Sequence, residues 1–286
     1  MAQSNVAICG LVRDCEQNLG GLIPRVEKLG SAFGSYRVVV VENDSTDQTG
    51  QVVRKWSLQN PRVETIQFCY LPTNHPVRRI ETGRDNSAGG WFGRERIDRI
   101  AFARNRYLDA IAADPSLDYV IIIDLDIRSF SLSGVAHSFG RAREWDIATA
   151  NGKRYSKRHP LRLSVYWDAY AYEPRSGFIS GKQTLNQIRS CQLDVAKELR
   201  DGQLLPARSA FGGLGIYRAK FLAGNRYTVL DNDDPDVPIL CEHHALHRSI
   251  SDAAGNVRLC INPRQTVDYG SPLQLARYSL RTVFRH

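Results

Sequence analysis

The chain has 286 residues, of which 42% are hydrophobic and 24% are charged, an ordinary composition for a globular protein. A chain of this length can bury a full core, as one large α/β domain or as two small ones. No apolar run approaches the roughly 20 residues that span a bilayer, and the first residues lack a basic segment followed by a long apolar one. We therefore expect a cytoplasmic protein with no integral membrane segment.

The basic charge balance and the scattered cysteines narrow the possible partners and folds. The formal net charge is +8, which implies an anionic partner such as nucleic acid, an anionic membrane surface or a nucleotide diphosphate. None of the six cysteines lies in a Cys-x-x-Cys pair, and several fall in apolar, strand-like segments where a reduced cysteine acts as a small hydrophobe. This pattern does not fit a disulfide scaffold.

The first half of the chain alternates predicted strands and helices. The expected elements are strands over residues 5–12, 37–41, about 63–71 and 118–124, and helices over 16–33, about 47–58 (capped by Ser45, Thr46 or Asp47) and about 94–113. Such alternation predicts an α/β fold with a mostly parallel central sheet flanked by helices. The long polar loop over residues 71–93 carries several glycines near Trp91, which predicts a mobile lid at about residues 82–93.

The second half shows a more mixed pattern. The expected elements are strands over residues 145–150 and 161–172, a helix over 182–200, a glycine-broken strand over 208–217, a helix over 240–250 and a short strand over 256–261. No linker separates the halves, so we expect a single continuous domain over residues 1–286. Residues 1–126 would form its nucleotide-binding half, and residues 127–286 its acceptor-binding half.

The strongest single signal is an apolar run that ends in two acids. Residues 120–123 are apolar and β-branched, and Asp124-Leu125-Asp126 follows directly. Two neighbouring carboxylates at the end of a buried strand are costly to desolvate and repel each other, so they need a cation. Mg²⁺ or Mn²⁺ prefers such hard oxygen ligands and usually keeps room for substrate phosphates. Taken alone, the motif fits a solvated turn equally well.

Polar clusters follow three of the predicted strands. They occupy residues 11–14, 42–47 and 124–126, and a glycine-rich segment and a histidine cluster come later in the chain. In open α/β sheets, ligands bind beyond the carboxyl ends of the strands. The order of these clusters therefore indicates one ligand site at that edge of the sheet.

These features together resemble GT-A-fold, nucleotide-sugar-dependent glycosyltransferases, broadly of the family 2 type. The motifs that carry the resemblance are the strand-2 signature at residues 39–49 (VVVENDSTDQT), the A-R-N helix motif at Ala103-Arg104-Asn105, the D-x-D at Asp124-Leu125-Asp126, the glycine-rich acceptor-side strand at residues 211–218 (FGGLGIYR) and the acid and histidines at residues 241–244 (CEHH). A fainter likeness to capsule-associated mannosyltransferases of family 69 lies in residues 166–169 (YWDA) and in the Cys-Glu-His cluster. The resemblance covers about residues 4–265.

The resemblance implies a set of residues that bind the nucleotide sugar. Glu42 and Asp44 would accept hydrogen bonds from the base or ribose, or else cap the following helix. Arg104 would pair with Glu42 or Asp124, or touch the diphosphate. Arg94, with Arg99, would reach the phosphates or lie on a solvated helix face. The full set is Leu11, Arg13, Glu42, Asp44, Arg94, Arg104, Asp124, Leu125, Gly212 and Gly213.

The resemblance also implies Mn²⁺ or Mg²⁺ as cofactor. Asp126 would be the main metal ligand, and Asp124 would contact the ribose or a metal-bound water. Either His243 or His244 would complete the metal shell. The alternative is a zinc site, because His243 and His247 have the i, i+4 spacing of ligands on one helix face and Cys241 could add a third ligand.

Candidate acceptor-side residues follow from the same comparison. Glu242 is a candidate general base for the acceptor hydroxyl, or else a surface carboxylate on a helix. Asp168 would bind sugar hydroxyls, or it would serve as the catalytic carboxylate in place of Glu242. Trp91 and Trp167 would stack on sugar faces, and Gly212-Gly213 indicates close approach of the backbone to a ligand, or a bulge. An inverting enzyme needs such a base and a retaining one does not; the likeness to family 69 favours retention.

The resulting prediction is a metal-dependent glycosyltransferase. It would move a hexose from a UDP- or GDP-linked sugar to a hydroxyl of a glycan or similar acceptor. One alternative is a sugar nucleotidyltransferase, although residues 9–14 (CGLVRD) match its phosphate loop poorly. The other is a non-catalytic protein that binds nucleic acid or another polyanion, which would need basic and aromatic residues interleaved on one face. No such stripe is visible, so no nucleic-acid partner is expected.

Overall fold

The structure, a computed structural model, describes residues 1–69, 90–154 and 164–270. Its centre is an eleven-stranded sheet with the order β3-β2-β1-β4-β10-β6-β13-β9-β8, in which β5 also pairs with β13 and β7 with β6. The strands are β1 (Asn5–Val12), β2 (Ser35–Asn43), β3 (Val63–Phe68), β4 (Tyr119–Asp124), β5 (Ser129–Phe130), β6 (Ile147–Arg154), β7 (Val165–Tyr166), β8 (Glu173–Pro174), β9 (Leu205–Ser209), β10 (Leu214–Arg218) and β13 (Leu259–Asp268), with a separate pair formed by β11 (Leu230–Asp231) and β12 (Ile239–Leu240).

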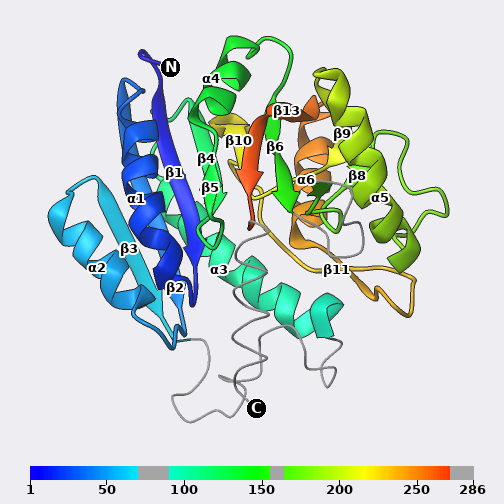
Figure 1. Cartoon of the computed structure of the whole chain (residues 1–286), viewed down its shortest axis with the longest axis horizontal. Coiled ribbons are helices and arrows are strands. Elements are labelled where there is room, and N and C mark those ends of the chain that lie inside the picture. Colours follow the sequence, from blue (N-terminus) through cyan, green and yellow to red (C-terminus); the bar gives the residue numbers. More distant parts are fainter. Residues whose placement is uncertain (70–89, 155–163, 271–286) are drawn as a thin grey trace.

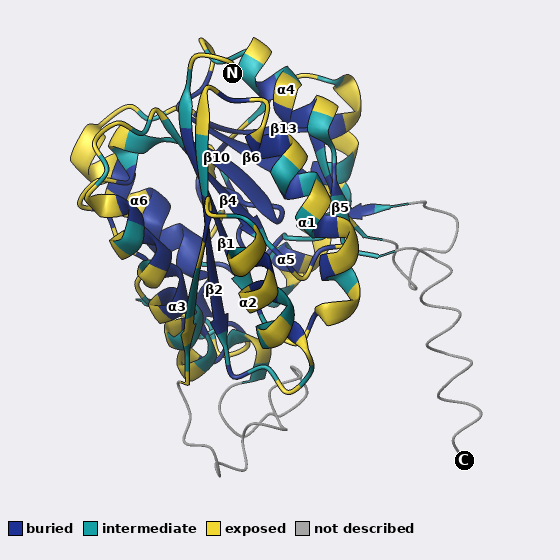
Figure 2. Ribbon diagram, turned by 90° about the vertical axis from the view of Figure 1, so that its left-hand side faces the viewer, coloured by how far each residue is buried: buried dark blue, intermediate teal, exposed yellow. Residues whose placement is uncertain are grey.

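Helices cover both faces of this sheet (Figure 1). They are α1 (Glu16–Gly30), α2 (Thr49–Gln59), α3 (Arg94–Ala112), α4 (Leu132–Gly140), α5 (Leu185–Glu198) and α6 (Glu242–Ala254). Buried side chains of α1, α2 and α4 form one core cluster with one face of the sheet, and those of α3, α5 and α6 form a second cluster with the other. Figure 2 shows the buried strands between helices whose outer surfaces are exposed.

The alternating side chains of each central strand explain why both faces need cover. In β2, Val38 and Val40 point into the cluster with α1 and α2, whereas Val39 and Val41 point into the cluster with α3. A strand that is buried on both faces has a continuous apolar run, which is typical of parallel α/β sheets. All strands on the main path except β10 and β9 run in one direction, as the pairings show. The predicted single α/β domain with a mostly parallel sheet is confirmed.

The predicted strand over residues 208–217 is wrong. The segment forms two strands, β9 and β10, that are not neighbours in the sheet. β9 pairs with β8 and β13, whereas β10 lies antiparallel between β4 and β6. Gly212 (φ 68°) and Gly213 (φ 85°) turn the chain between them through a backbone conformation that side chains with a Cβ rarely adopt.

Other predicted boundaries also change. Within the expected strand over residues 161–172, the described part is extended only at Val165–Tyr166, and the expected short strand over residues 256–261 continues to Asp268. The second helix begins at Thr49 after Gln48, not after a side-chain cap, although Asp47 Oδ1 accepts from the Thr49 backbone N–H. Helix α4 was not predicted; Ser131 caps it by accepting from the Gly134 N–H.

The expected lid lies mostly outside the described residues, which begin again at Gly90. Gly90–Phe92 forms one 3-10 turn that leads into α3, and the Trp91 side chain in it is 45% exposed. None of the described helices is both long and apolar enough to cross a membrane.

Candidate active site

The carboxyl ends of β1, β2 and β4 meet at one edge of the sheet. Leu11 pairs with Val41 on one side and with Asp124 on the other. Beyond β4, the Leu125 N–H donates to the Leu11 carbonyl at 3.0 Å, and the Asp124 N–H donates to the Gly213 carbonyl at 3.0 Å. The structure therefore brings the predicted residues Leu11, Asp124, Leu125 and Gly213 into direct contact.

The loops after β1 and β2 are tied to each other. Asp14 accepts from the backbone N–H of Thr46 at 2.6 Å, and Glu16 accepts from the backbone N–H of Gln48 at 2.6 Å. Asp14 has a positive φ of 47°, which costs energy for any residue with a Cβ but is tolerated better by Asp than by most. The Arg13 guanidinium lies 3.6 Å from the Asp14 carboxylate. Side-chain to backbone bonds between the loops thus build one rigid rim.

The predicted nucleotide ligands Glu42 and Asp44 lie buried within this rim. Glu42 accepts from the Ser45 backbone N–H at 3.0 Å and from the Gln67 amide at 3.1 Å. Asp44 has a φ of 51° and accepts from the Asn43 amide at 3.1 Å. The Glu42 carboxylate therefore holds the loop in shape, and its binding of a base or ribose stays a prediction, as does that of Asp44.

Arg104 is the centre of a buried charge network. Its Nε donates to Glu242 Oε1 at 2.9 Å, and its Nη2 donates to Asp124 Oδ1 at 2.9 Å. The side chain is 5% exposed, and its guanidinium lies over the Phe211 and Tyr227 rings at 5.1 and 5.6 Å. Of the two predicted partners of Arg104, the structure shows Asp124; the second carboxylate is Glu242, from the far end of the sequence.

Asp124 and Asp126 have different partners. Burial raises the pKa of Asp124, while the adjacent Arg104 opposes that rise. Asp126 is exposed, yet desolvation by the surrounding protein and the nearby Asp124 carboxylate raise its pKa to about 6. Asp126 makes no ion pair with another described residue. Its carboxylate therefore lies beside a second carboxylate and faces open space.

Asp168 joins the same group of carboxylates from the turn after β7. Its Oδ2 accepts from the Gly212 N–H at 2.9 Å. Burial raises the pKa of Asp168 to about 7, and the negative charges of Asp124 and Glu242 contribute to that rise. A Cβ at Gly212 would lie 2.0 Å from the Ala150 carbonyl oxygen, so only glycine fits where this N–H meets Asp168. The Gly212-Gly213 turn therefore presents an N–H to a carboxylate.

Glu242 is buried at the start of α6, which rules out the alternative of a surface carboxylate on a helix. Besides its ion pair with Arg104, Glu242 accepts at Oε2 from the Cys241 thiol at 3.3 Å. Both carboxylate oxygens are therefore engaged. The role of Glu242 as a general base stays a prediction, while its position is that of a counter-ion to Arg104.

The histidines of α6 are packed in the core. His243 stacks on Phe211 with the ring centroids 4.0 Å apart, and burial lowers its pKa well below the ordinary value, so the imidazole is neutral. Neither of its ring nitrogens has a hydrogen-bond partner among the described residues. His244 Nε2 lies 2.9 Å from the Tyr170 carbonyl oxygen, and its Nδ1 lies 3.5 Å from Glu173.

The alternative zinc site finds no support in this arrangement. His247 is hydrogen-bonded through both ring nitrogens, to Ser209 at 2.9 Å and to Tyr217 at 3.0 Å. Nowhere in residues 1–69, 90–154 and 164–270 do three His, Cys, Asp or Glu side chains form a group that could hold a metal. That His243 or His244 completes a metal shell around Asp126 stays a prediction.

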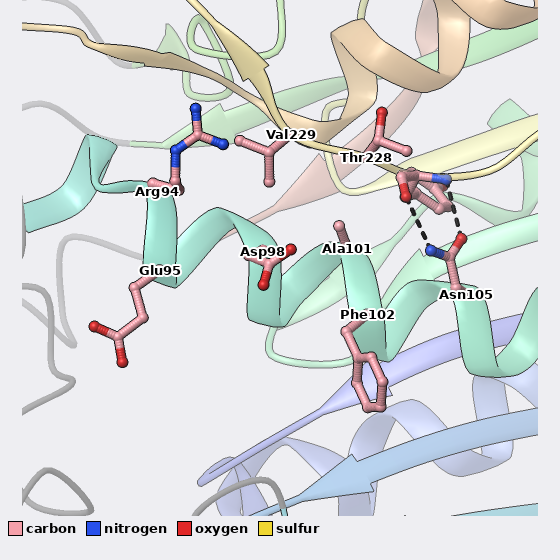
Figure 3. A pocket seen from close by; sticks show the side chains of 9 residues that line it. Arg94, Glu95, Asp98, Ala101, Phe102, Asn105, Thr228 and Val229 are labelled. Carbon is pink, nitrogen blue, oxygen red and sulfur yellow. Dashed lines mark hydrogen bonds between the residues drawn. The ribbon is translucent and has the colours of Figure 1, made fainter.

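The Arg94 guanidinium has its ion-pair partner outside the group of carboxylates described above. It pairs with Asp231 and lines a separate pocket between α3 and the segment of Thr228 and Val229 (Figure 3). Arg96 is the residue of this turn that acts on the site. Burial raises the pKa of both Asp124 and Asp126, and the Arg96 charge is among the effects that oppose this rise.

The sequence analysis missed Arg96, although a signal existed. Arg96 lies eight residues before Arg104, and two i, i+4 steps along a helix keep two side chains on neighbouring parts of one surface. Arg96 also lies over the Trp91 ring at 4.2 Å. The 3-10 turn is thereby attached to the site-facing side of α3.

Asn105 of the A-R-N motif has a structural role. Its amide donates to the Tyr227 carbonyl at 2.9 Å and its oxygen accepts from the Tyr227 N–H at 3.0 Å, as the paired dashed lines in Figure 3 show. This exchange copies the hydrogen bonding of neighbouring strands. It holds the segment whose Tyr227 ring lies beside Arg104.

Tyr269, directly after β13, is a site residue that the sequence analysis also missed. A Cβ at Gly213 would lie 2.4 Å from the Tyr269 hydroxyl, so this hydroxyl sits directly above the glycine turn. Burial raises the pKa of Tyr269 well above its ordinary value, and the negative charges of Asp168, Asp124 and Asp126 add to the effect. No local motif marks a tyrosine at a strand end, so only the fold reveals it.

Comparisons with known proteins give similarity in overall structure only. No protein-family profile matches the sequence, and no curated protein matches it. The structure is similar to S. aureus TarS (1-349) in complex with UDP-GlcNAc, at 16% identity and a TM-score of 0.46, covering 93% of this chain and 58% of that one. It is also similar to the mannosyltransferase PcManGT from Pyrobaculum calidifontis in complex with GDP-Man and Mn²⁺, at 12% identity and a TM-score of 0.47, covering 91% of this chain and 57% of that one.

A third similar structure is glucosyl-3-phosphoglycerate synthase from Mycobacterium tuberculosis in complex with Mn²⁺, uridine diphosphate and phosphoglyceric acid. Its identity is 13% and its TM-score 0.43, covering 98% of this chain and 76% of that one. The chain thus spans less than two thirds of the length of the first two structures. Identities and TM-scores this low do not show what this chain binds or does.

Proposed function

We propose that this protein is a GT-A-type glycosyltransferase that moves a hexose from a nucleotide sugar to a hydroxyl of a glycan or similar acceptor. The observation that carries the proposal is the arrangement of Asp124 and Asp126 beyond β4. Arg104 neutralises Asp124 from within the protein, whereas Asp126 has no such partner among the described residues and faces open space. A carboxylate left in this state at the ligand-binding edge of an α/β sheet is suited to a cation that arrives with its substrate.

The residues at this edge fit Mn²⁺ or Mg²⁺. Asp126 would be the main ligand, and Asp124 retains its second oxygen because Arg104 occupies only Oδ1. Octahedral metals of this kind are often held by one or two carboxylates together with substrate phosphates, so the absence of a third protein ligand among the described residues is compatible with such a site. When bound, the metal would neutralise charge that develops on the departing diphosphate.

The chain itself supplies cations and a base around this position. Arg96 places positive charge near Asp124 and Asp126, where the leaving diphosphate would gain negative charge. Asp168 is the better placed of the two candidate bases, because its pKa of about 7 matches proton transfer at neutral pH while Glu242 is committed to Arg104. In this proposal Asp168 takes the proton of the acceptor hydroxyl, and Glu242 positions Arg104.

The turn after β1 does not favour a sugar nucleotidyltransferase. Such an enzyme needs backbone N–H groups there for phosphates. Here the N–H of Asp14 donates to the Ser45 hydroxyl, the N–H of Cys15 to the Thr49 hydroxyl and the N–H of Glu16 to the Asp47 carboxylate. With Asp14 and Glu16 adding negative charge, this turn is unsuited to an anion.

Ligand binding measured by thermal shift tests the proposal. UDP or GDP should raise the melting temperature of the wild type in the presence of Mn²⁺ and much less without it, because a ligand that binds only the folded state stabilises it. Asp126→Ala should abolish the Mn²⁺-dependent shift, whereas Asp98→Ala, which removes an exposed carboxylate from the separate pocket beside α3, should retain it. A full shift in Asp126→Ala would refute this assignment of the metal site.

A further inference from the structure

Arg154, at the end of β6, is a partly buried cation with an unusual environment. Its guanidinium lies over the Trp167 ring at 3.8 Å. It makes no ion pair or hydrogen bond with another described residue. Burial lowers the pKa of Arg154, and no carboxylate in the described part of the chain compensates for the lost water. Two other partly buried arginines, Arg37 and Arg218, instead pair with Glu64 and Asp146.

The stacked guanidinium keeps its donors available. An arginine that lies on an aromatic ring uses its face, while its five N–H groups project from the edge of the plane. A carboxylate or phosphate can accept two of these in parallel, the strongest type of arginine contact. Partial burial makes such a contact worth more than at a fully solvated surface.

Trp167 and Tyr269 connect Arg154 to the carboxylate site. The Trp167 backbone N–H donates to the Gly152 carbonyl at 2.9 Å, and the centroid of the Trp167 ring lies 6.2 Å from that of Tyr269. Asp168 follows Trp167 in the chain, and the Tyr269 hydroxyl sits above Gly213. Arg154, Trp167 and Tyr269 are each partly accessible. They therefore form one partly accessible surface next to Asp168.

We propose that Arg154, Trp167 and Tyr269 form the acceptor subsite, and that the acceptor is a saccharide carrying an anionic group, either a carboxylate or a phosphate. This rests on the proposed glycosyl transfer and specifies its acceptor. The Trp167 ring binds the apolar face of the pyranose, the Arg154 edge binds the anion, and Asp168 lies at the end of the surface where the acceptor hydroxyl reacts. The donor diphosphate belongs to the other end, at Asp126.

Direct binding of three probes tests the subsite independently of turnover. Methyl glucoside, methyl glucuronoside and glucose 6-phosphate share a pyranose and differ in charge. Their affinities, measured by ligand-detected NMR titration, therefore report how much the anionic group adds to binding. Wild type should bind at least one charged probe roughly 10- to 100-fold more tightly than the neutral one, the range of a charge-assisted hydrogen bond. Which charged probe binds more tightly identifies carboxylate or phosphate as the recognised group.

Variants assign the preference to residues. Arg154→Met keeps a flexible side chain on Trp167 and should reduce the preference to near parity, whereas Arg154→Lys should retain part of it. Lys153→Ala removes the neighbouring exposed charge and is the matched control, with the wild-type preference expected. Trp167→Ala should weaken the binding of all three probes. Melting temperatures confirm folding, and Arg154→Lys remains informative if Arg154→Met does not fold.

Three results would overturn the subsite: equal affinity of wild type for charged and neutral probes, a preference that survives in Arg154→Met, or a loss of UDP or GDP binding in Arg154→Met, which would assign Arg154 to the donor. These outcomes are separate from failure of the proposed function. If the Arg154-dependent preference is present but no hexose is transferred, the subsite stands without that activity. If hexose is transferred with no charge preference, the activity stands without the subsite.

Discussion

The two sides of the site stabilise their carboxylates in different ways. In the loops after β1 and β2, Asp14, Glu42 and Asp47 accept hydrogen bonds from the backbone N–H groups of Thr46, Ser45 and Thr49. Around β4, α3 and α6, the carboxylates of Asp124 and Glu242 are balanced by one guanidinium, that of Arg104. On the first side, many backbone dipoles share in stabilising the negative charges, whereas on the second side a single cation stabilises two of them.

This difference separates a rigid rim from the proposed reactive centre. Backbone N–H groups favour the ionised carboxylate, and the pKa of Asp47 is indeed lowered by its hydrogen bonds to Thr49, against the opposing effect of burial. On the other side, burial raises the pKa of Asp126 to about 6 and that of Asp168 to about 7, and neither carboxylate forms an ion pair with another described residue. Carboxylates that titrate near neutral pH are characteristic of functional sites.

The largest expected effect distinguishes the two acids of the reactive centre. If Asp168 is the base, Asp168→Asn should lower the transfer rate by roughly 10²- to 10⁴-fold while nucleotide binding persists. Glu242→Gln should lower it less and should instead lower the melting temperature, because it weakens the support of Arg104. Steady-state kinetics with thermal melting of both variants measures this difference. A larger rate loss in Glu242→Gln with an unchanged melting temperature would return the base role to Glu242.

The next effect concerns the concentrated charge itself. Arg104→Met leaves Asp124 and Glu242 without a counter-ion in the interior, and should lower the free energy of unfolding by about 3 to 5 kcal/mol. Adding Glu242→Gln to Arg104→Met should recover part of this loss. The matched control is Arg94→Met: its pair with Asp231 is largely exposed, so the cost should stay below about 1 kcal/mol. Chemical denaturation measures the free energy of unfolding of both variants. Equal losses in Arg104→Met and Arg94→Met would show that the buried network contributes no more than an exposed ion pair.

A smaller effect follows from the pKa of Asp168. It rises from 3.8 to about 7 on folding, so between these values the folded state binds more protons than the unfolded state. The contribution of Asp168 to stability is therefore lost as pH increases from about 4 to about 7. Asp168→Asn should raise the melting temperature by roughly 5 °C or more at pH 8 and leave it nearly unchanged at pH 4. An increase of the same size at both pH values would contradict the assigned pKa.

The smallest effect tests the rim. Asp14→Ala removes the bonds to Thr46 and leaves a Cβ at positive φ, so it should cost about 1 to 2 kcal/mol of unfolding free energy. Asp14→Asn keeps an acceptor oxygen and a side chain that tolerates this backbone, so it should cost less than half as much. Neither change should shift the pH dependence of transfer, because Asp14 lies on the rim. A shifted pH profile would place Asp14 within the reactive centre.

The local sequence determined the strands that are buried on both faces and the regular alternation of strands with helices in the first half of the chain. Strands β1, β2 and β4 were predictable because a central parallel strand must be apolar along its whole length, and the polar residues that follow each one mark the ligand-binding edge. Asp124 and Asp126 were identifiable for the same reason. The position of an acid at the end of such a run depends on a few neighbouring residues.

Tertiary structure alone decided the rest of the site, because its contacts join residues far apart in the chain. Arg104 meets Glu242 across 138 residues, and β10 separates from β9 to lie beside β4. Arg94 and Arg96 are two residues apart, yet helix rotation directs one to Asp231 and leaves the other to act on Asp124. Tyr269 joins the glycine turn only because β13 ends there. A sequence pattern encodes which face of an element is apolar, whereas the partner of a polar group depends on which elements the sheet brings together.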